Sequence, residues 1–140
     1  FILGLVALML SVSAIVSLFV SRWWQGMLYN PGGFGEEFRG FRLDPRVAGL
    51  LLLAVVAGMR LPSGYEFWAE LMAVPLLMSG LAVAHHSVKF LQAGGQWIVF
   101  MYIGLVAFGP TIGVLLVGLG FADSILNLRS RLADVKNRQP

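Results

Sequence analysis

Long uncharged apolar stretches dominate the chain, and short polar segments separate them. These stretches predict helices at residues 1–21, 46–61, 67–91 and 97–128. The last stretch has no charged residue from Trp97 to Ala122. As one straight helix it would reach about 48 Å, against about 30 Å for the hydrocarbon core of a bilayer. We therefore predict an all-α, polytopic transmembrane helix bundle with four visible spans, in a single region over residues 1–140.

The centre of the last stretch contains both a proline and a GxxxG pair. Pro110 predicts a kink, and Gly109 and Gly113 predict close packing against another helix. Two half-helices with a re-entrant bend are the alternative, but each would have about a dozen residues, too few to span alone. We predict one kinked helix that continues as an amphipathic C-terminal tail over residues 121–140.

Small residues recur at every fourth position of the first span and include Ser13 and Ser17. A stripe of this kind lets another helix approach closely, so we expect both serines to serve helix packing.

The polar connection over residues 22–46 is the longest between two spans. Within it, Phe34, Phe38 and Phe41 share one face of a short helix. We expect an amphipathic segment that lies in the membrane interface between spans one and two. Asp44-Pro45 favours the start of the next helix, with the aspartate as its N-cap.

Composition supports a membrane protein, since 58% of the 140 residues are hydrophobic and only 12% are charged. The chain has no cysteine, which excludes disulfides and thiolate sites. Its net charge of +3 suits anionic lipid headgroups better than nucleic acid, because no basic run is present. The chain begins inside an apolar run without methionine. We therefore expect a fragment of a longer membrane protein and no signal peptide.

Four spans would place the connection 22–46 and the loop 86–96 on one side of the membrane. The turn 60–66 and the C-terminal tail would lie on the other side. Five basic residues then fall on each side. The positive-inside rule therefore does not determine the orientation from these counts. The connection 22–46 also holds Glu36, Glu37 and Asp44, whereas the tail has only Asp134 beyond Asp123, and on that basis we predict a cytoplasmic C-terminus.

His85 and His86 are the two histidines of the chain and lie near the end of the third span. Adjacent side chains on a helix point about 100° apart, so the pair cannot easily bind one metal ion. Both histidines either lie in the water interface near Lys89, or contribute to a ligand-binding or proton-linked site.

Asp123 is the other ionisable residue near a span, and Arg129 and Arg131 follow it. In one interpretation, Asp123 lies at the interface and is paired with an arginine or with a helix end. In the other, Asp123, Arg129 and Arg131 form a docking surface for a partner, and the arginines mark the orientation of the chain in the membrane. The sequence contains no P-loop and no catalytic triad. We expect no enzymatic activity, no cofactor, no bound metal and no nucleic-acid partner.

Three segments together resemble the C-terminal half of the YybS-like bacterial membrane proteins, a family of unknown function. They are residues 36–43 (EEFRGFRL), residues 80–86 (GLAVAHH) and residues 102–131. The last of these ends in the arrangement Gly120, Asp123 and Arg129, which is similar to the end of that family's last span.

The resemblance implies a distant relation to the substrate-binding S components of energy-coupling-factor transporters. It implies a multi-pass protein of the bacterial inner membrane with a cytoplasmic C-terminus, in contact with the lipid bilayer and with another membrane subunit. It would place residues 23–46 and 86–96 outside, where loops cap a pocket for a small molecule. The pocket candidates are then Trp23, Trp24, Tyr29, Asn30, His85, His86, Gln96 and Trp97. The alternative is a structural or assembly protein that acts through helix contacts.

Overall fold

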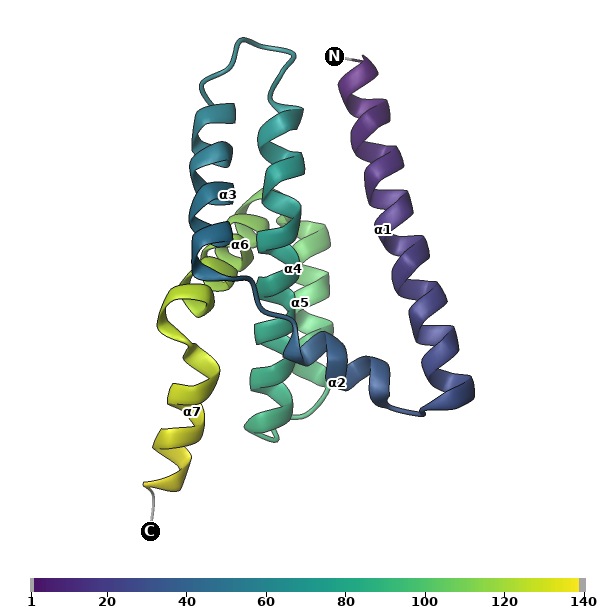
Figure 1. Cartoon of the computed structure of the whole chain (residues 1–140), viewed down its shortest axis with the longest axis vertical. Helices are drawn as coiled ribbons and strands as arrows, with labels where there is room; N and C mark the ends of the chain where they lie inside the picture. Colours follow the sequence, from purple (N-terminus) through teal and green to yellow (C-terminus); the bar gives the residue numbers. More distant parts are fainter. Residues whose placement is uncertain (1, 139–140) are drawn as a thin grey trace.

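A computed structural model describes residues 2–138 as seven helices and the short segments that join them. They are α1 (Ile2–Tyr29), α2 (Gly33–Gly40), α3 (Pro45–Gly58), α4 (Phe67–Phe90), α5 (Gln96–Ala107), α6 (Gly109–Leu126) and α7 (Leu128–Asn137) (Figure 1). By length and composition α1, α4 and α6 can cross a membrane, whereas α3 and α5 are shorter apolar helices. The all-α prediction is confirmed, and helix hydropathy indicates a multi-span membrane protein.

The helix α4 is the centre of the bundle and carries more of the buried residues than any other helix. It forms an antiparallel pair with α3, where Gly58 brings the two backbones together. A methyl group at Gly58 would lie 2.9 Å from the Cβ atom of Ala69. The α3–α4 pair is therefore held by small residues, as is typical of helices packed in membranes.

The closest contact in the bundle is the crossing of α4 and α6, which depends on two glycines. A Cβ atom at Gly80 would clash directly with the carbonyl oxygen of Leu116, and one at Gly120 would clash with the carbonyl oxygen of Leu76. Each glycine thus faces the backbone of the other helix. Only glycine, which has no side chain, allows the backbones of α4 and α6 to lie this close together.

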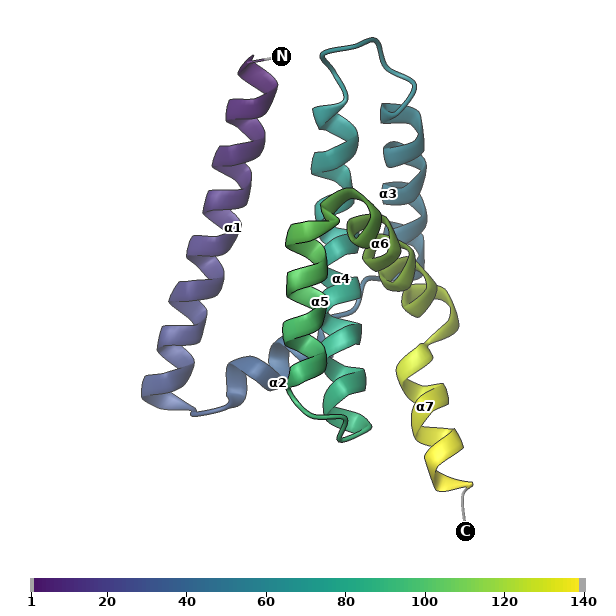
Figure 2. The same cartoon turned by 180° about the vertical axis from the view of Figure 1, so that it is seen from behind.

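The predicted single kinked helix over residues 97–128 is wrong. Phe108 leaves the helical region (φ −127°, ψ 39°), α5 ends at Ala107 and α6 begins at Gly109. A Cβ atom at Gly104 would lie 3.7 Å from Ile112, whereas eight residues of a straight helix would separate them by about 12 Å. The chain therefore folds back on itself, and Figures 1 and 2 show α6 returning toward the end from which α5 rises.

The reversal has a local cause in Pro110. This residue has no N–H to donate, so it cannot continue α5, but it is tolerated in the first turn of a new helix. It occupies that position in α6. A second break follows at Asn127, whose left-handed backbone (φ 49°) separates α6 from α7. The tail is thus a separate helix rather than a continuation of the span.

Within the described residues nothing lies within 4 Å of a Cβ atom at Gly109 or Gly113, so neither glycine packs closely against a helix of this chain. Ser13 and Ser17 are exposed on α1 and contribute to no buried contact there. Packing of these positions against a helix of another chain stays a prediction. Within this chain, the close contact between helices is at Gly80 and Gly120, where α6 crosses α4.

The first two helices are joined by an aromatic cluster at one end of the molecule. The helix α1 extends to Tyr29, eight residues beyond the predicted span. The ring of Phe19 lies edge-on at 5.9 Å from Phe34 and 5.7 Å from Phe38 of α2. The predicted amphipathic helix is present, although it ends at Gly40 and leaves Phe41 outside. Asp44 caps α3 as predicted, since its side chain accepts a hydrogen bond from the Arg46 amide at 2.8 Å.

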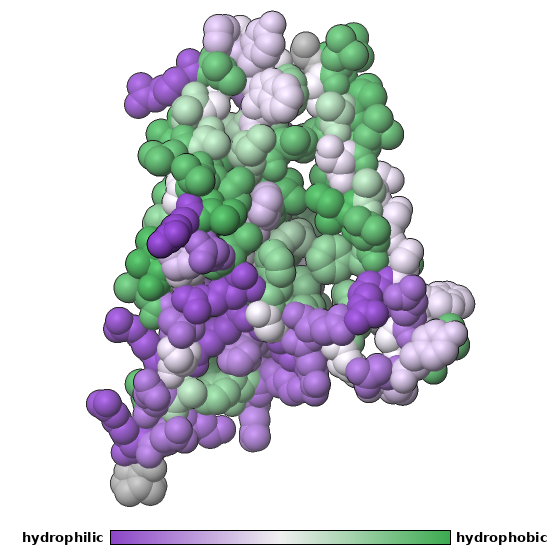
Figure 3. All heavy atoms as spheres, viewed as in Figure 1, coloured by the Kyte–Doolittle hydropathy of each residue, from purple (hydrophilic) through white to green (hydrophobic). Residues whose placement is uncertain are grey.

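Polar residues gather at one end of the molecule, which we call the polar end (Figure 3). This end contains α2, the loop between α4 and α5, and α7, while the α3–α4 loop lies at the opposite end (Figures 1 and 2). The predicted topology is therefore wrong, because the reversal returns the tail to the side of α2. Most of the lysines and arginines belong to segments at the polar end, in the last turns of α1, in α2, at the end of α4 and in α7, whereas Arg60 belongs to the α3–α4 loop at the opposite end.

Candidate functional site

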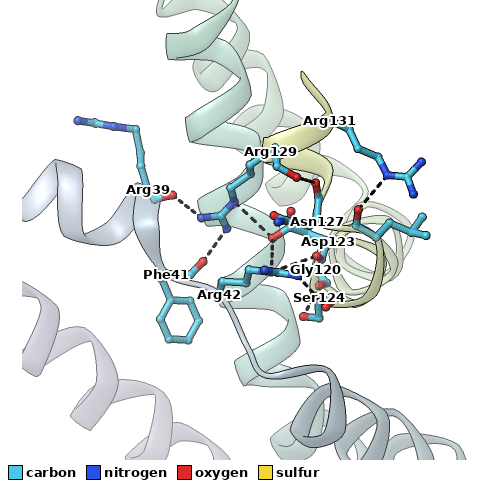
Figure 4. Close-up of polar contacts among 11 residues, drawn as sticks. Arg39, Phe41, Arg42, Gly120, Asp123, Ser124, Asn127, Arg129 and Arg131 are labelled. Atoms are coloured by element: carbon cyan, nitrogen blue, oxygen red, sulfur yellow. Dashed lines mark hydrogen bonds and ion pairs between the residues drawn. The ribbon is translucent and has the colours of Figure 1, made fainter. Parts of the chain in front are cut away.

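A buried carboxylate lies where three segments meet near the polar end (Figure 4). Asp123, in the last turn of α6, is fully buried. Its Oδ2 atom lies 3.3 Å from Nε of Arg129 on α7 and 3.9 Å from Nε of Arg42, which precedes α3. A buried carboxylate without a cation would cost several kcal/mol. The two arginines therefore allow Asp123 to be buried there.

The same two arginines cap the ends of helices. Arg42 donates from Nε to the carbonyl of Asp123 (3.2 Å) and from Nη2 to that of Ser124 (3.0 Å), at the end of α6. Arg129 donates from Nη1 to the carbonyl of Arg39 (2.5 Å) and from Nη2 to that of Phe41 (2.6 Å), at the end of α2. Cations are favoured at helix C-termini, where carbonyls lack partners. We call Asp123, Arg42 and Arg129 the Asp–Arg cluster.

The Asp–Arg cluster bears on both interpretations of Asp123. Asp123 is fully buried and pairs with the arginines, as the first interpretation expects. Arg131 donates from Nε to the carbonyl of Leu126 at 3.0 Å and adds a further cap to α6. A docking role of Arg129 and Arg131 stays a prediction. Burial lowers the pKa of Arg129, and the Asp123 carboxylate opposes that change.

An open groove separates α1 and α2 from α4 and α5, with a volume of about 650 Å³. Most of its walls are aromatic or apolar, and the polar groups are few. We call it the aromatic groove, and it is lined by Phe19, Val20, Trp23, Gly26, Met27, Gly32, Phe34, Gly35, Phe38, Arg39, His85 and Tyr102. This size and composition are typical of small-molecule sites.

His85 is held in a defined orientation at the groove. Its Nδ1 atom lies 2.8 Å from the carbonyl of Leu81. Because a carbonyl only accepts, Nδ1 carries the proton and Nε2 is left free for another partner. The ring packs edge-on against Phe38 (5.4 Å) and Tyr102 (5.8 Å). The imidazole is therefore fixed by its neighbours on α2 and α5.

A second cavity, of about 460 Å³, lies between α2, α4 and α7. His86 lines this cavity rather than the groove, so the two histidines face different spaces, as their helical spacing predicts. We call it the basic cavity, and it is lined by Glu36, Arg39, Gly40, His86, Lys89, Phe90 and Arg129. Arg39 lines both the groove and the cavity.

The eight pocket candidates from the sequence fall into four places. Trp23 and His85 line the aromatic groove, and His86 lines the basic cavity. Tyr29 and Asn30 line a small crevice of about 120 Å³ beside the Arg22–Glu37 ion pair. Trp24, Gln96 and Trp97 are exposed and line none of these spaces.

Sequence reasoning missed several residues of these sites. Arg42 belongs to a polar loop, and nothing local connects it to Asp123, which follows 81 residues later. Tyr102 lies inside an apolar run, and its neighbours predict only a membrane-spanning helix. The spacing of Phe34 and Phe38 did identify the face of α2 that lines the groove.

Within residues 2–138, no group of three or more histidine, aspartate or glutamate side chains is placed to hold a metal ion. The chain matches no model of a known protein family, no curated protein and no solved structure.

Proposed function

We propose that this chain is part of a membrane subunit that binds a small molecule in the aromatic groove. The observation that carries the proposal is the groove itself, where four helices surround about 650 Å³ with aromatic walls. Sites of this size accept small organic ligands, and a few fixed polar groups orient them. The distant relation to transporter S components remains part of this proposal, because such proteins bind small molecules within a helix bundle.

The lining favours a ligand with a flat apolar body and one acidic group. Trp23, Phe34 and Phe38 offer aromatic surfaces. Arg39 supplies a cation that can pair with a carboxylate or phosphate, and the free Nε2 of His85 can take part in a hydrogen bond. The phenol of Tyr102, whose ring packs against that of His85, provides a further donor in the lining.

The charge distribution supports an orientation with the polar end in the cytoplasm. Most of the basic residues belong to segments at that end, and cytoplasmic loops carry the excess of lysine and arginine. The C-terminus is then cytoplasmic in a bacterial inner membrane. The loops at residues 23–46 and 86–96 are cytoplasmic too, so the extracellular loops implied by the resemblance are not part of the proposal.

The test is mass spectrometry of small molecules that copurify with the full-length protein. We expect at least one compound whose amount falls about tenfold in His85→Ala, which removes about 1.4 kcal/mol or more of binding. Trp97→Ala removes an exposed aromatic residue outside the groove and should retain the compound. If every copurifying compound is equally abundant in both variants, the binding role is wrong.

An assembly role is the second candidate, and the exposed surface of α1 favours it. In the apolar window of this helix only 6% of residues are buried. Lipid or the helix of another subunit must cover that surface. Ser13→Leu together with Ser17→Leu should then release a partner membrane protein without changing the ligand content. Retention of all partners would count against assembly.

A further inference from the structure

We propose that the basic cavity binds a phosphate-bearing anion, either the headgroup of an anionic phospholipid or a soluble phosphate compound. The cavity shares only Arg39 with the aromatic groove, and the role proposed for the groove does not require an anion in the cavity. Three helices contribute cations to its lining, Arg39 from α2, Lys89 from α4 and Arg129 from α7. Glu36 is the one acidic residue in that lining.

The cations of the cavity exceed the acids that could neutralise them. Asp123 pairs with Arg129 at 3.3 Å. Within residues 2–138, neither Arg39 nor Lys89 forms an ion pair. Like charges that share a cavity repel each other, and a bound anion removes that repulsion while it gains charge-assisted hydrogen bonds.

Arg129 provides a rigid part of this site. Two of its five N–H donors are bonded to the carbonyls of Arg39 and Phe41, and Nε faces Asp123. Two donors remain for a ligand. Because the guanidinium is already fixed, an anion that binds it loses little side-chain entropy.

The opposite wall of the cavity is apolar. Phe90 stacks on His86 with ring centroids 5.9 Å apart, and the Lys136 ammonium lies 4.9 Å from the centre of the Phe90 ring. Phosphate oxygens can meet the arginines while carbon atoms of the same ligand lie against Phe90. The segments of α2, α4 and α7 that line the cavity lie at the polar end. Figure 3 shows a boundary between this polar end and the apolar part of the molecule, and lipid phosphates occur at such a boundary. Basic pockets between transmembrane helices on the cytoplasmic side bind such headgroups.

The test compares charge-removing variants of the full-length protein in detergent. Arg39→Gln and Lys89→Gln each remove one cation from the cavity, and the Arg39 carbonyl that holds Arg129 stays. Arg138→Gln removes an exposed cation from the same end, outside the cavity. Native mass spectrometry measures retained phosphatidylglycerol, and calorimetry measures binding of millimolar inorganic phosphate. Unchanged thermal unfolding of each variant establishes that it is folded.

For a lipid site, we expect Arg39→Gln and Lys89→Gln to lower retained phosphatidylglycerol about tenfold or more. Arg138→Gln should lower it by no more than about fivefold, the effect of a general surface charge. For a soluble ligand, inorganic phosphate should bind the wild type and Arg138→Gln but not the two cavity variants, while lipid retention stays equal. If the cavity variants match Arg138→Gln in both measurements, the proposal is wrong. The groove ligand should be unaffected by Lys89→Gln, which separates this outcome from failure of the groove.

Discussion

Arg42 Nη2 donates to the backbone carbonyl of Ser124 at 3.0 Å, which joins two segments 82 residues apart. The two arginines cap each other's preceding helices. Arg42 follows α2 and caps the end of α6. Arg129 follows α6 and caps the end of α2. Asp123 lies between the two guanidinium groups. The cluster thus fixes α2 and α7 against the end of the α4–α6 crossing, and so forms one boundary of the basic cavity.

Loss of Arg129 should destabilise the protein strongly. In Arg129→Gln the buried Asp123 carboxylate keeps only Arg42, whose Nε atom is 3.9 Å away. Breaking a buried ion pair by removing one partner costs about 3–5 kcal/mol. Thermal unfolding followed by tryptophan fluorescence measures the change, and Arg60→Gln at the opposite end serves as the control.

A double-mutant cycle separates the ion pair from the carbonyl contacts. Asp123→Asn with Arg129→Gln should cost less than the sum of the two single changes, because the buried carboxylate is also gone. Additive effects would mean that Arg129 acts only as a helix cap.

The α4–α6 crossing predicts opposite effects for two glycines. Gly80→Ala places a methyl group against the Leu116 carbonyl and should cost about 1–3 kcal/mol or more, because backbone cannot move aside as a side chain can. Gly113→Ala meets open space and should be neutral, or gain up to about 1 kcal/mol from helix propensity. The same unfolding measurement applies, and equal effects at both positions would contradict the crossing.

The contact between Arg22 and Glu37 should depend on pH. The hydrogen bond from Arg22 lowers the pKa of Glu37 below its ordinary value of 4.5. A carboxyl group whose pKa is lower in the folded state than in the unfolded state stabilises the folded protein at pH values above its unfolded-state pKa. This contribution is lost as the pH falls through the folded-state pKa. The difference in unfolding midpoint between wild type and Glu37→Gln should therefore be constant near neutral pH and shrink below about pH 4.5. A difference that persists in acid would show that the ion pair is not its source.

Local features were predictable from the sequence, and long-range ones were not. The Asp44 cap, the phenylalanine face of α2 and the apolar helices follow from spacing and residue type within one segment. Pro110 fits either a kink or a new helix start, and its local sequence does not choose between them. The choice depends on Gly80 and Gly120, which let α6 pack across α4. In the same way, Arg42 has no local partner, and its role exists only once α6 has folded back.

The reversal at Phe108 has a direct test in the membrane, since the chain has no native cysteine. Single cysteines at Gly95 and Asn137 should have the same accessibility, because the loop before α5 and the end of α7 lie at one end. A cysteine at Ser63, in the α3–α4 loop, should have the opposite accessibility. With the polar end cytoplasmic, a membrane-impermeant maleimide should label only Ser63→Cys in intact cells and all three after permeabilisation.

The labelling outcomes distinguish the reversal from the orientation. If Asn137→Cys behaves like Ser63→Cys and unlike Gly95→Cys, then α5 and α6 form one crossing helix in the membrane. In that case the Asp–Arg cluster would have to be taken apart, because Arg129 and Arg42 would lie on opposite sides. If Gly95→Cys and Asn137→Cys are labelled together in intact cells and Ser63→Cys is protected, the fold stands but the polar end faces outward. The positive-inside rule makes that result unfavourable, because most of the basic residues belong to segments at the polar end.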